Sequence, residues 1–119
     1  MKTVFLALLL TFAAFTASTQ TISYDGVRQD VVIDVRTPTE FSLGHINGAV
    51  NVPLDRLTEN TEALKHIDRN SHILVYCRSG RRSATAMKLL EQRGFRHVRD
   101  GGGMATLTSK LKACDNHRC

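Results

Sequence analysis

Residues 73–83, ILVYCRSGRRS, join a short apolar run to a polar loop, and the interpretation of the whole chain starts from them. Residues 73–76 are continuously apolar, as in a strand that is buried on both faces of a parallel sheet. Cys77 follows at once, and a loop of arginine, serine and glycine leads into a helical pattern at residues 82–93. This order of strand, tight loop and helix is typical of α/β proteins, which bind ligands at the carboxyl ends of their strands.

The remaining patterns extend the same architecture along the chain. Short β-branched or apolar runs predict further strands at residues 31–35, 50–52 and 97–99. Periodicity and turn residues predict helices at residues 38–43, 54–66 and 82–93, and Gly94 stands where a helix cap belongs. We therefore expect an α/β fold with a mostly parallel central sheet of four or five strands flanked by helices. The chain length allows one such domain and not two.

The first 18 residues predict a signal peptide. Met1 and Lys2 form a short positive region, residues 4–17 are apolar apart from two threonines, and small residues follow. An uncleaved anchor would need about 20 apolar residues, and an N-terminal core helix would show a polar face. We therefore expect a periplasmic or secreted protein that is free of the membrane once the signal peptide is removed. The expected organisation is a signal peptide (1–18), a short lead (19–30), one domain (31–110) and a cysteine-containing tail (111–119).

Charge and composition narrow the classes of partner. The 119 residues include 16 Lys and Arg against 11 Asp and Glu, which gives a net charge of +5. This excess is spread thinly except around Cys77, so the net charge does not by itself indicate nucleic acid, and small anionic ligands are left as candidates. A hydrophobic content of 42% excludes collagen-like and disordered chains. We expect a monomer.

Cys77 is the candidate catalytic residue. Arg78, Arg81 and Arg82 lie within five residues of it. Backbone N–H groups of the loop and the positive end of the following helix would also face its sulfur, and all of these favour the nucleophilic thiolate. The alternative is an inert cysteine at the end of a core strand, with its arginines in solvent. Gly80 and the arginine cluster favour the reactive site.

Loop length separates the classes of cysteine chemistry. A tyrosine-type phosphatase needs an arginine at the sixth position after its nucleophile to clamp a phosphoryl group, and here that position is Ser83. A Cys-x-x-Cys redox motif is also absent, because the next cysteine after Cys77 is Cys114. The tight loop suits a single sulfur atom better than a phosphate.

Five segments taken together resemble the rhodanese (thiosulfate sulfurtransferase) family, and the size and export signal resemble its single-domain periplasmic, phage-shock type. The segments are IDVR at 33–36, EF at 40–41, GHI-x-GA-x-N-x-P at 44–53, YCRSG-x-RS at 76–83 and GG at 101–102. Any one of them alone would be a weak signal. Their order over residues 31–103 makes the resemblance specific.

The resemblance implies a rhodanese-like fold and sulfur transfer through Cys77. The thiolate would attack the outer sulfur of thiosulfate, expel sulfite and become a persulfide, which passes its sulfur to cyanide or a thiol acceptor. The substrate-binding loop would comprise Arg78, Ser79, Gly80, Arg81, Arg82 and Ser83. No cofactor or metal is expected, because a preformed thiolate needs no activating base. The alternative is a non-enzymatic persulfide carrier that delivers sulfur to a periplasmic partner.

Three further residues of the resemblance are expected to support the site. Asp34 and Arg36 should pair with each other or with the backbone, because a carboxylate beside Cys77 would oppose its ionisation. His45 is expected to belong to the scaffold rather than to act as a general base.

The chain also departs from the family pattern at two places. The lead at 19–30 is shorter than the usual opening strand and helix, so the first strand is expected to be short or missing. Met104 and Leu107 stand in the region of the usual tryptophan, so the acceptor side of the site is expected to differ.

The tail carries two cysteines, Cys114 and Cys119, beyond the resemblance. Export to an oxidising compartment favours a disulfide between them. The alternatives are a soft metal site that also uses His117, and thiol exchange with a Cys77 persulfide. Exchange requires that the tail reach the loop.

Overall fold

The structure is a computed structural model that describes residues 21–59, 62–114 and 119. The expected signal peptide, residues 1–18, lies outside the described residues. In chain order the elements are β1 Ile22–Tyr24, β2 Val27–Gln29, β3 Val31–Asp34, α1 Pro38–Leu43, β4 Val50–Asn51, α2 Leu54–Leu57, α3 Glu62–Lys65, β5 His72–Cys77, α4 Arg81–Gln92, β6 His97–Gly103, α5 Met104–Lys110 and β7 Lys112–Ala113.

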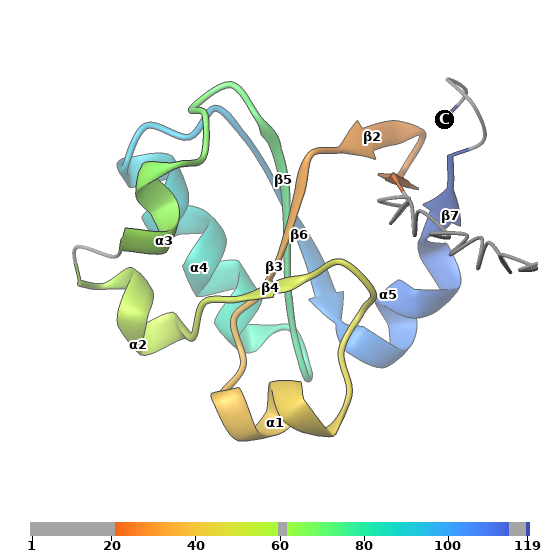
Figure 1. Cartoon of the computed structure of the whole chain (residues 1–119), viewed down its shortest axis with the longest axis horizontal. Helices are drawn as coiled ribbons and strands as arrows, with labels where there is room; N and C mark the ends of the chain where they lie inside the picture. The colour runs from red at the N-terminus through yellow and green to blue at the C-terminus, as the bar shows by residue number, and fades with distance from the viewer. Residues whose placement is uncertain (1–20, 60–61, 115–118) are drawn as a thin grey trace, which may run out of the picture.

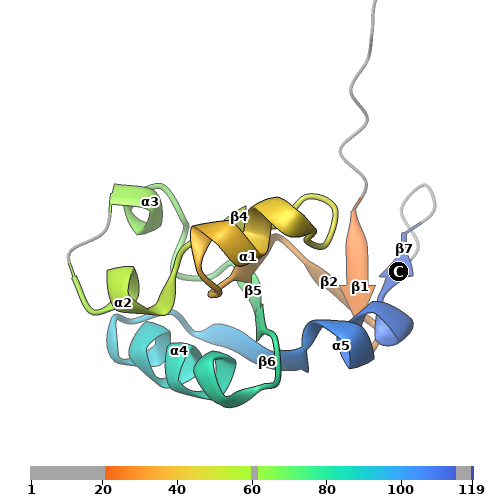
Figure 2. The same ribbon diagram turned by 90° about the horizontal axis from the view of Figure 1, so that it is seen from below.

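A parallel sheet of four strands, in the order β4-β3-β5-β6, forms the centre of the molecule (Figure 1). β3 and β5 pair from Val31 opposite Ile73 to Asp34 opposite Tyr76, so their carboxyl ends lie at one level. Helices flank this sheet, which confirms the expected α/β fold. In Figure 1 the carboxyl ends point down toward α1, and Figure 2 looks onto this edge.

The side chains of β5 alternate between two apolar layers, as the pleat of a strand requires. Ile73, Val75 and Cys77 face the layer that contains the buried side chains of α2, α3 and α4. Leu74 and Tyr76 face the other layer, which is completed by side chains of α1, α5 and β1. Because both faces are covered, the strand is apolar throughout, and Cys77 points toward α4.

Helix α1 has the bounds that the sequence predicts, because its N-terminus is well capped. The Thr37 hydroxyl accepts a hydrogen bond from the Glu40 N–H, and the Glu40 carboxylate accepts one from the Thr37 N–H. This reciprocal arrangement is a capping box, and Pro38 occupies the first helical position. α4 also agrees closely with its prediction, and it begins after Gly80.

The single helix predicted at residues 54–66 is wrong. The chain forms two short helices there, α2 ending at Leu57 and α3 beginning at Glu62. Residues 58–61 are Thr-Glu-Asn-Thr and offer no apolar group to the core, and the Thr58 hydroxyl donates to the Asp55 carbonyl at 2.6 Å. Leu57 and Leu64 still reach the core from the two pieces.

The lead and the tail pair with each other in a small antiparallel sheet that the sequence analysis did not foresee. Its order is β2-β1-β7, with Ile22 opposite Ala113. The Cys114 N–H donates to the Thr21 carbonyl at 2.8 Å. The opening strand β1 is therefore short, as expected, and it lies in this small sheet rather than in the central one.

Cys114 and Cys119 are joined by a disulfide, while Cys77 is a free, buried thiol. The C-terminus lies near β7, on the other side of α5 from the end of β5 that carries Cys77 (Figure 1). This arrangement does not bring the tail cysteines to the loop, and a disulfide offers no thiolate to a metal. His117 lies outside the described residues. Among the helices of the described residues, none has the length and apolar character needed to span a membrane.

Candidate functional site

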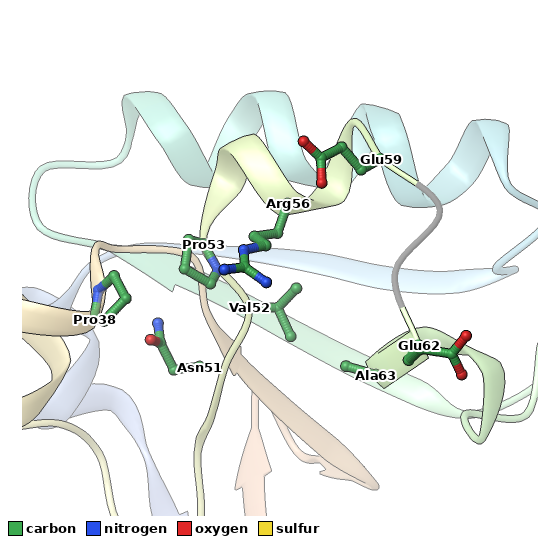
Figure 3. Close-up of a pocket in the computed structure, with 8 residues that line it drawn as sticks. All are labelled: Pro38, Asn51, Val52, Pro53, Arg56, Glu59, Glu62 and Ala63. Atoms are coloured by element: carbon green, nitrogen blue, oxygen red, sulfur yellow. The ribbon is translucent and has the colours of Figure 1, made fainter.

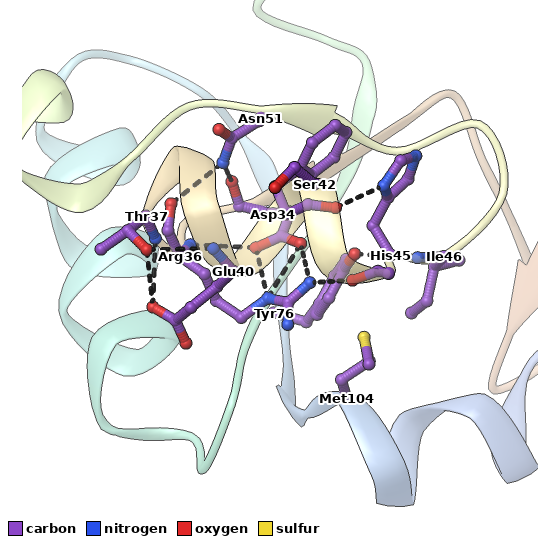
Figure 4. A network of polar contacts seen from close by, with 12 residues as sticks. Asp34, Arg36, Thr37, Glu40, Ser42, His45, Ile46, Asn51, Tyr76 and Met104 are labelled. Atoms are coloured by element: carbon purple, nitrogen blue, oxygen red, sulfur yellow. Dashed lines mark hydrogen bonds and ion pairs between the residues drawn. The ribbon is translucent and has the colours of Figure 1, made fainter.

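Asp34 and Arg36 form a buried ion pair where β3 ends (Figure 4). The Arg36 Nη2 and Nε donate to the Asp34 carboxylate at 2.7 and 3.0 Å, and the Arg36 backbone N–H donates to it at 2.9 Å. The hydrogen bonds to Asp34 raise the pKa of the Arg36 guanidinium. Arg36 also donates to the Gly44 carbonyl at 2.6 Å, so the pair fixes the loop that follows α1.

Two neighbours complete this frame. The Asn51 amide donates to the carbonyls of Asp34 and Arg36, at 3.0 Å each, and ties β4 to the end of β3. The Tyr76 hydroxyl accepts from the Ile46 N–H at 3.0 Å, from the side opposite Cys77. Burial raises the pKa of Tyr76 to about 12, so the phenol stays neutral. The polar groups of this frame are therefore hydrogen-bonded to one another, and they hold the carboxyl edge of the sheet in place.

His45 has a scaffold position in the structure. Its ring stacks on Phe41 with centroids 3.6 Å apart, and its Nδ1 donates to the Phe41 carbonyl at 2.9 Å. The carbonyl can only accept, so this contact assigns the proton to Nδ1. Both contacts brace the end of α1, which is the role that the sequence predicts in preference to general-base catalysis.

Cys77 is enclosed by the loop that follows it. Its side chain is fully buried, and its sulfur accepts a hydrogen bond from the Gly80 N–H at 2.9 Å. The thiol lies 3.5 Å from the Ser83 hydroxyl oxygen, which itself donates to the Gly80 carbonyl at 3.1 Å. Gly80 adopts φ +100°, a left-handed conformation that favours glycine.

Two opposing effects act on the pKa of the Cys77 thiol. Burial raises it, because a thiolate loses solvation in an apolar interior. Hydrogen bonds with the Ser83 side chain and with the backbone N–H groups of Ser83, Gly80 and Ser79 lower it. The hydrogen bonds prevail, and the pKa lies below its ordinary value. The site therefore stabilises the thiolate, the nucleophilic form, relative to that of an ordinary cysteine.

The three arginines of the loop differ in their surroundings: one is ion-paired and two are exposed. Arg82 is held by Glu40 through two hydrogen bonds, Nη1 to Oε1 at 2.7 Å and Nη2 to Oε2 at 3.0 Å. These bonds lower the pKa of Glu40 to about 2, so the ion pair persists at any physiological pH. Arg78 and Arg81 are exposed. An incoming anion would thus meet Arg78 and Arg81, while Arg82 links α4 to α1.

Glu40 holds Arg82 beside the loop, a contact that sequence reasoning missed. The spacing of Thr37 and Glu40 is a recognisable capping box, and Glu40 lies in the EF segment of the resemblance. Its second partner, Arg82, is 42 residues away in sequence. No local pattern could have paired them.

A pocket with a cavity volume of about 480 Å³ lies beside β4, between α1, α2 and α3 (Figure 3). Pro38, Asn51 and Arg56 are among its lining residues, and none of residues 77–83 lines it. The Cys77 loop therefore does not form this pocket. In residues 21–59 and 62–114, no group of three or more histidine, cysteine or acidic side chains is placed to hold a metal ion.

Comparisons with known proteins agree with this geometry. The family model for the rhodanese-like domain matches residues 20–105. The thiosulfate sulfurtransferase PspE of Escherichia coli (strain K12) is 39% identical over 72 residues, which cover 60% of this chain and 68% of PspE. The putative sulfur carrier protein YrkF of Bacillus subtilis (strain 168) is 34% identical over 67 residues, 56% of this chain and 35% of YrkF.

Among solved structures, the rhodanese with anions from E. coli superposes with a TM-score of 0.60 and 32% identity. The match covers 69% of this chain and 95% of that one. A family match over residues 20–105, together with a parallel sheet that ends in a thiol-enclosing loop, shows that this chain belongs to the rhodanese family.

Proposed function

We propose that this protein is a thiosulfate sulfurtransferase that carries sulfur on Cys77. The observation that supports this most strongly is the enclosed thiol whose pKa is lowered by hydrogen bonds from its own loop. Such a group is nucleophilic without an external base. Membership of the rhodanese family supports sulfur transfer as the class of reaction.

In the first step the Cys77 thiolate attacks the outer sulfur of thiosulfate. A new S–S bond forms on Cys77, the S–S bond of thiosulfate breaks, and its electron pair leaves with sulfite. The donor and the leaving group are both dianions, so the exposed guanidinium groups of Arg78 and Arg81 would stabilise them. Arg82 has a different role in this proposal, because Glu40 already holds it.

In the second step the outer sulfur of the persulfide is transferred to a thiophilic acceptor. Cyanide attacks that sulfur, the persulfide S–S bond breaks, and its electron pair returns to Cys77 as the thiolate. The products are thiocyanate and the starting enzyme. The same N–H groups that stabilise the thiolate would hold the terminal sulfur of the persulfide anion between the steps.

A persulfide carrier is the second candidate function. Cys77 is fully buried, which restricts access to the sulfur and would slow turnover with free small molecules. One relative, YrkF, is named a putative sulfur carrier. A carrier would accept sulfur on Cys77 yet form thiocyanate only negligibly, whereas an enzyme would turn over many times.

We also propose that the protein acts outside the cytoplasm. The order of charged, apolar and small residues in 1–18 supports export. The Cys114–Cys119 disulfide supports it independently, because such bonds persist in oxidising compartments.

Replacing Cys77 with serine should abolish thiosulfate-dependent thiocyanate formation. Serine keeps nearly the size of the side chain, but its hydroxyl group does not ionise at neutral pH. The assay is the colorimetric determination of thiocyanate with purified mature protein. A Cys114→Ser/Cys119→Ser double variant is the matched control and should keep most of the activity. Unchanged turnover in Cys77→Ser would reject the assignment.

Alanine at Arg78 or Arg81 should raise the KM for thiosulfate, by about three- to tenfold for each if each contributes about 1 kcal/mol to binding a dianion. Arg28→Ala is the control, since Arg28 is an exposed arginine on β2 in the small sheet. Steady-state kinetics at fixed ionic strength measure the effect. Equal KM values for the three variants and the wild type would exclude these two side chains from donor binding.

Alkylation of Cys77 should reach half its maximal rate at a lower pH in the folded protein than in the urea-unfolded chain. The folded pKa is the lower one. The folded protein therefore holds a thiolate at pH values where the unfolded chain still holds a thiol. The lower pKa in the folded state stabilises the folded protein at pH values above the unfolded pKa. This stabilisation is lost as the pH falls through the folded pKa. Iodoacetamide kinetics on the oxidised chain measure Cys77 alone, because Cys114 and Cys119 are paired. Coinciding profiles would contradict the proposed activation.

A further inference from the structure

Gly103, the last residue of β6, lies against the backbone of the Cys77 loop. It stands opposite Cys77 in the pairing of β5 with β6, just beyond an irregularity in the register. A Cβ atom at Gly103 would lie 2.7 Å from the Arg78 carbonyl oxygen and 3.4 Å from the Ser79 Cα. A carbon–oxygen distance of 2.7 Å is well inside van der Waals contact, so one backbone would have to move.

The backbone conformation at Gly103 does not itself call for glycine. Its angles, φ −81° and ψ 143°, are extended and open to any residue. Gly80 differs, because its φ of +100° favours glycine. Glycine is therefore needed at position 103 because there is no space for a side chain beside the loop.

A second contact shows that this packing continues along the loop. A Cβ atom at Gly80 would lie 3.6 Å from the Gly102 Cα and 3.9 Å from the Gly103 nitrogen. Residues 78–80 thus lie directly along residues 102–103, backbone against backbone. Neither side has a flexible side chain at these contacts that could move aside.

We infer that Gly103 is a positioning residue for sulfur transfer: its lack of a side chain lets the loop approach β6 and so aims the Ser79 and Gly80 N–H groups at the Cys77 sulfur. This inference rests on the proposed function, to which it adds a residue that does not touch the sulfur. The Gly80 N–H lies 2.9 Å from Sγ. A methyl group at 103 would displace Arg78 and Ser79, and this short contact would lengthen.

The test is the pH profile of Cys77 alkylation in Gly103→Ala, on the oxidised protein. Weaker N–H donation destabilises the thiolate, so the midpoint should move to higher pH. A rise of about half a pH unit would lower the thiolate fraction about threefold below the midpoint. Thiosulfate turnover under the same conditions should fall in proportion.

Gly48→Ala is the matched control. Gly48 has φ +81°, and a Cβ atom there would meet nothing within 4 Å, so alanine strains the backbone without touching the loop. This variant should unfold more easily than the wild type and keep the wild-type alkylation midpoint. Thermal unfolding of both variants separates lost stability from a moved midpoint.

Three results would overturn the inference. The first is an unchanged alkylation midpoint in folded Gly103→Ala, and the second is an equal rise of the midpoint in Gly48→Ala. The third is that Gly103→Ala fails to fold whereas Gly48→Ala folds, which would mean that the methyl group disrupts the core or α5 rather than the loop. Alkylation requires no sulfur donor. A wild type that lacks sulfur transfer would therefore reject the proposed function while leaving this test intact, and an unmoved midpoint in an active enzyme would reject the inference alone.

Discussion

The hydrogen bond from the Gly80 N–H to the Cys77 sulfur is the interaction on which the site depends. A cysteine with a fully buried side chain would ordinarily be an inert apolar group, because burial favours the neutral thiol. Here the loop turns its own N–H groups inward and lowers the thiol pKa despite that burial. The lowered pKa of Cys77 is therefore a property of the loop's hydrogen bonds more than of neighbouring charges.

Other parts of the structure hold that geometry from several sides. The parallel pairing of β3 with β5 brings the Asp34–Arg36 pair to the edge of the sheet where the loop begins. The Glu40–Arg82 ion pair attaches α1 to the second residue of α4. Both ion pairs therefore stabilise the scaffold around the loop. Arg78 and Arg81 are left exposed at the loop.

Much of this could be predicted from local patterns. The apolar runs of β3 and β5 and the caps of α1 and α4 are continuous in sequence, and so is the loop that encloses Cys77. The small sheet was only partly open to prediction. Its β1–β2 hairpin turns at Asp25-Gly26, a local hairpin signal that went unused. The pairing of β1 with β7 joins the two ends of the described chain, which no local pattern expresses. The single helix predicted at 54–66 is wrong because its apolar periodicity is interrupted by four polar residues at its centre.

Within the site, sequence reasoning singled out the free thiol of Cys77 but assigned all three arginines to the substrate. The capture of Arg82 by Glu40 depends on a contact between residues 42 positions apart. The role that we infer for Gly103 likewise depends on a carbonyl 25 positions earlier in the chain. Both are facts of tertiary packing, which residue spacing cannot express.

The central claim is that Cys77 carries the transferred sulfur, and mass spectrometry of the intact protein tests it most directly. Thiosulfate without an acceptor should add one sulfur atom per chain, located on the peptide that contains Cys77, with one sulfite released for each. Cyanide should then restore the original mass. An unchanged mass after thiosulfate, or a sulfur found on the tail cysteines instead, would contradict the account.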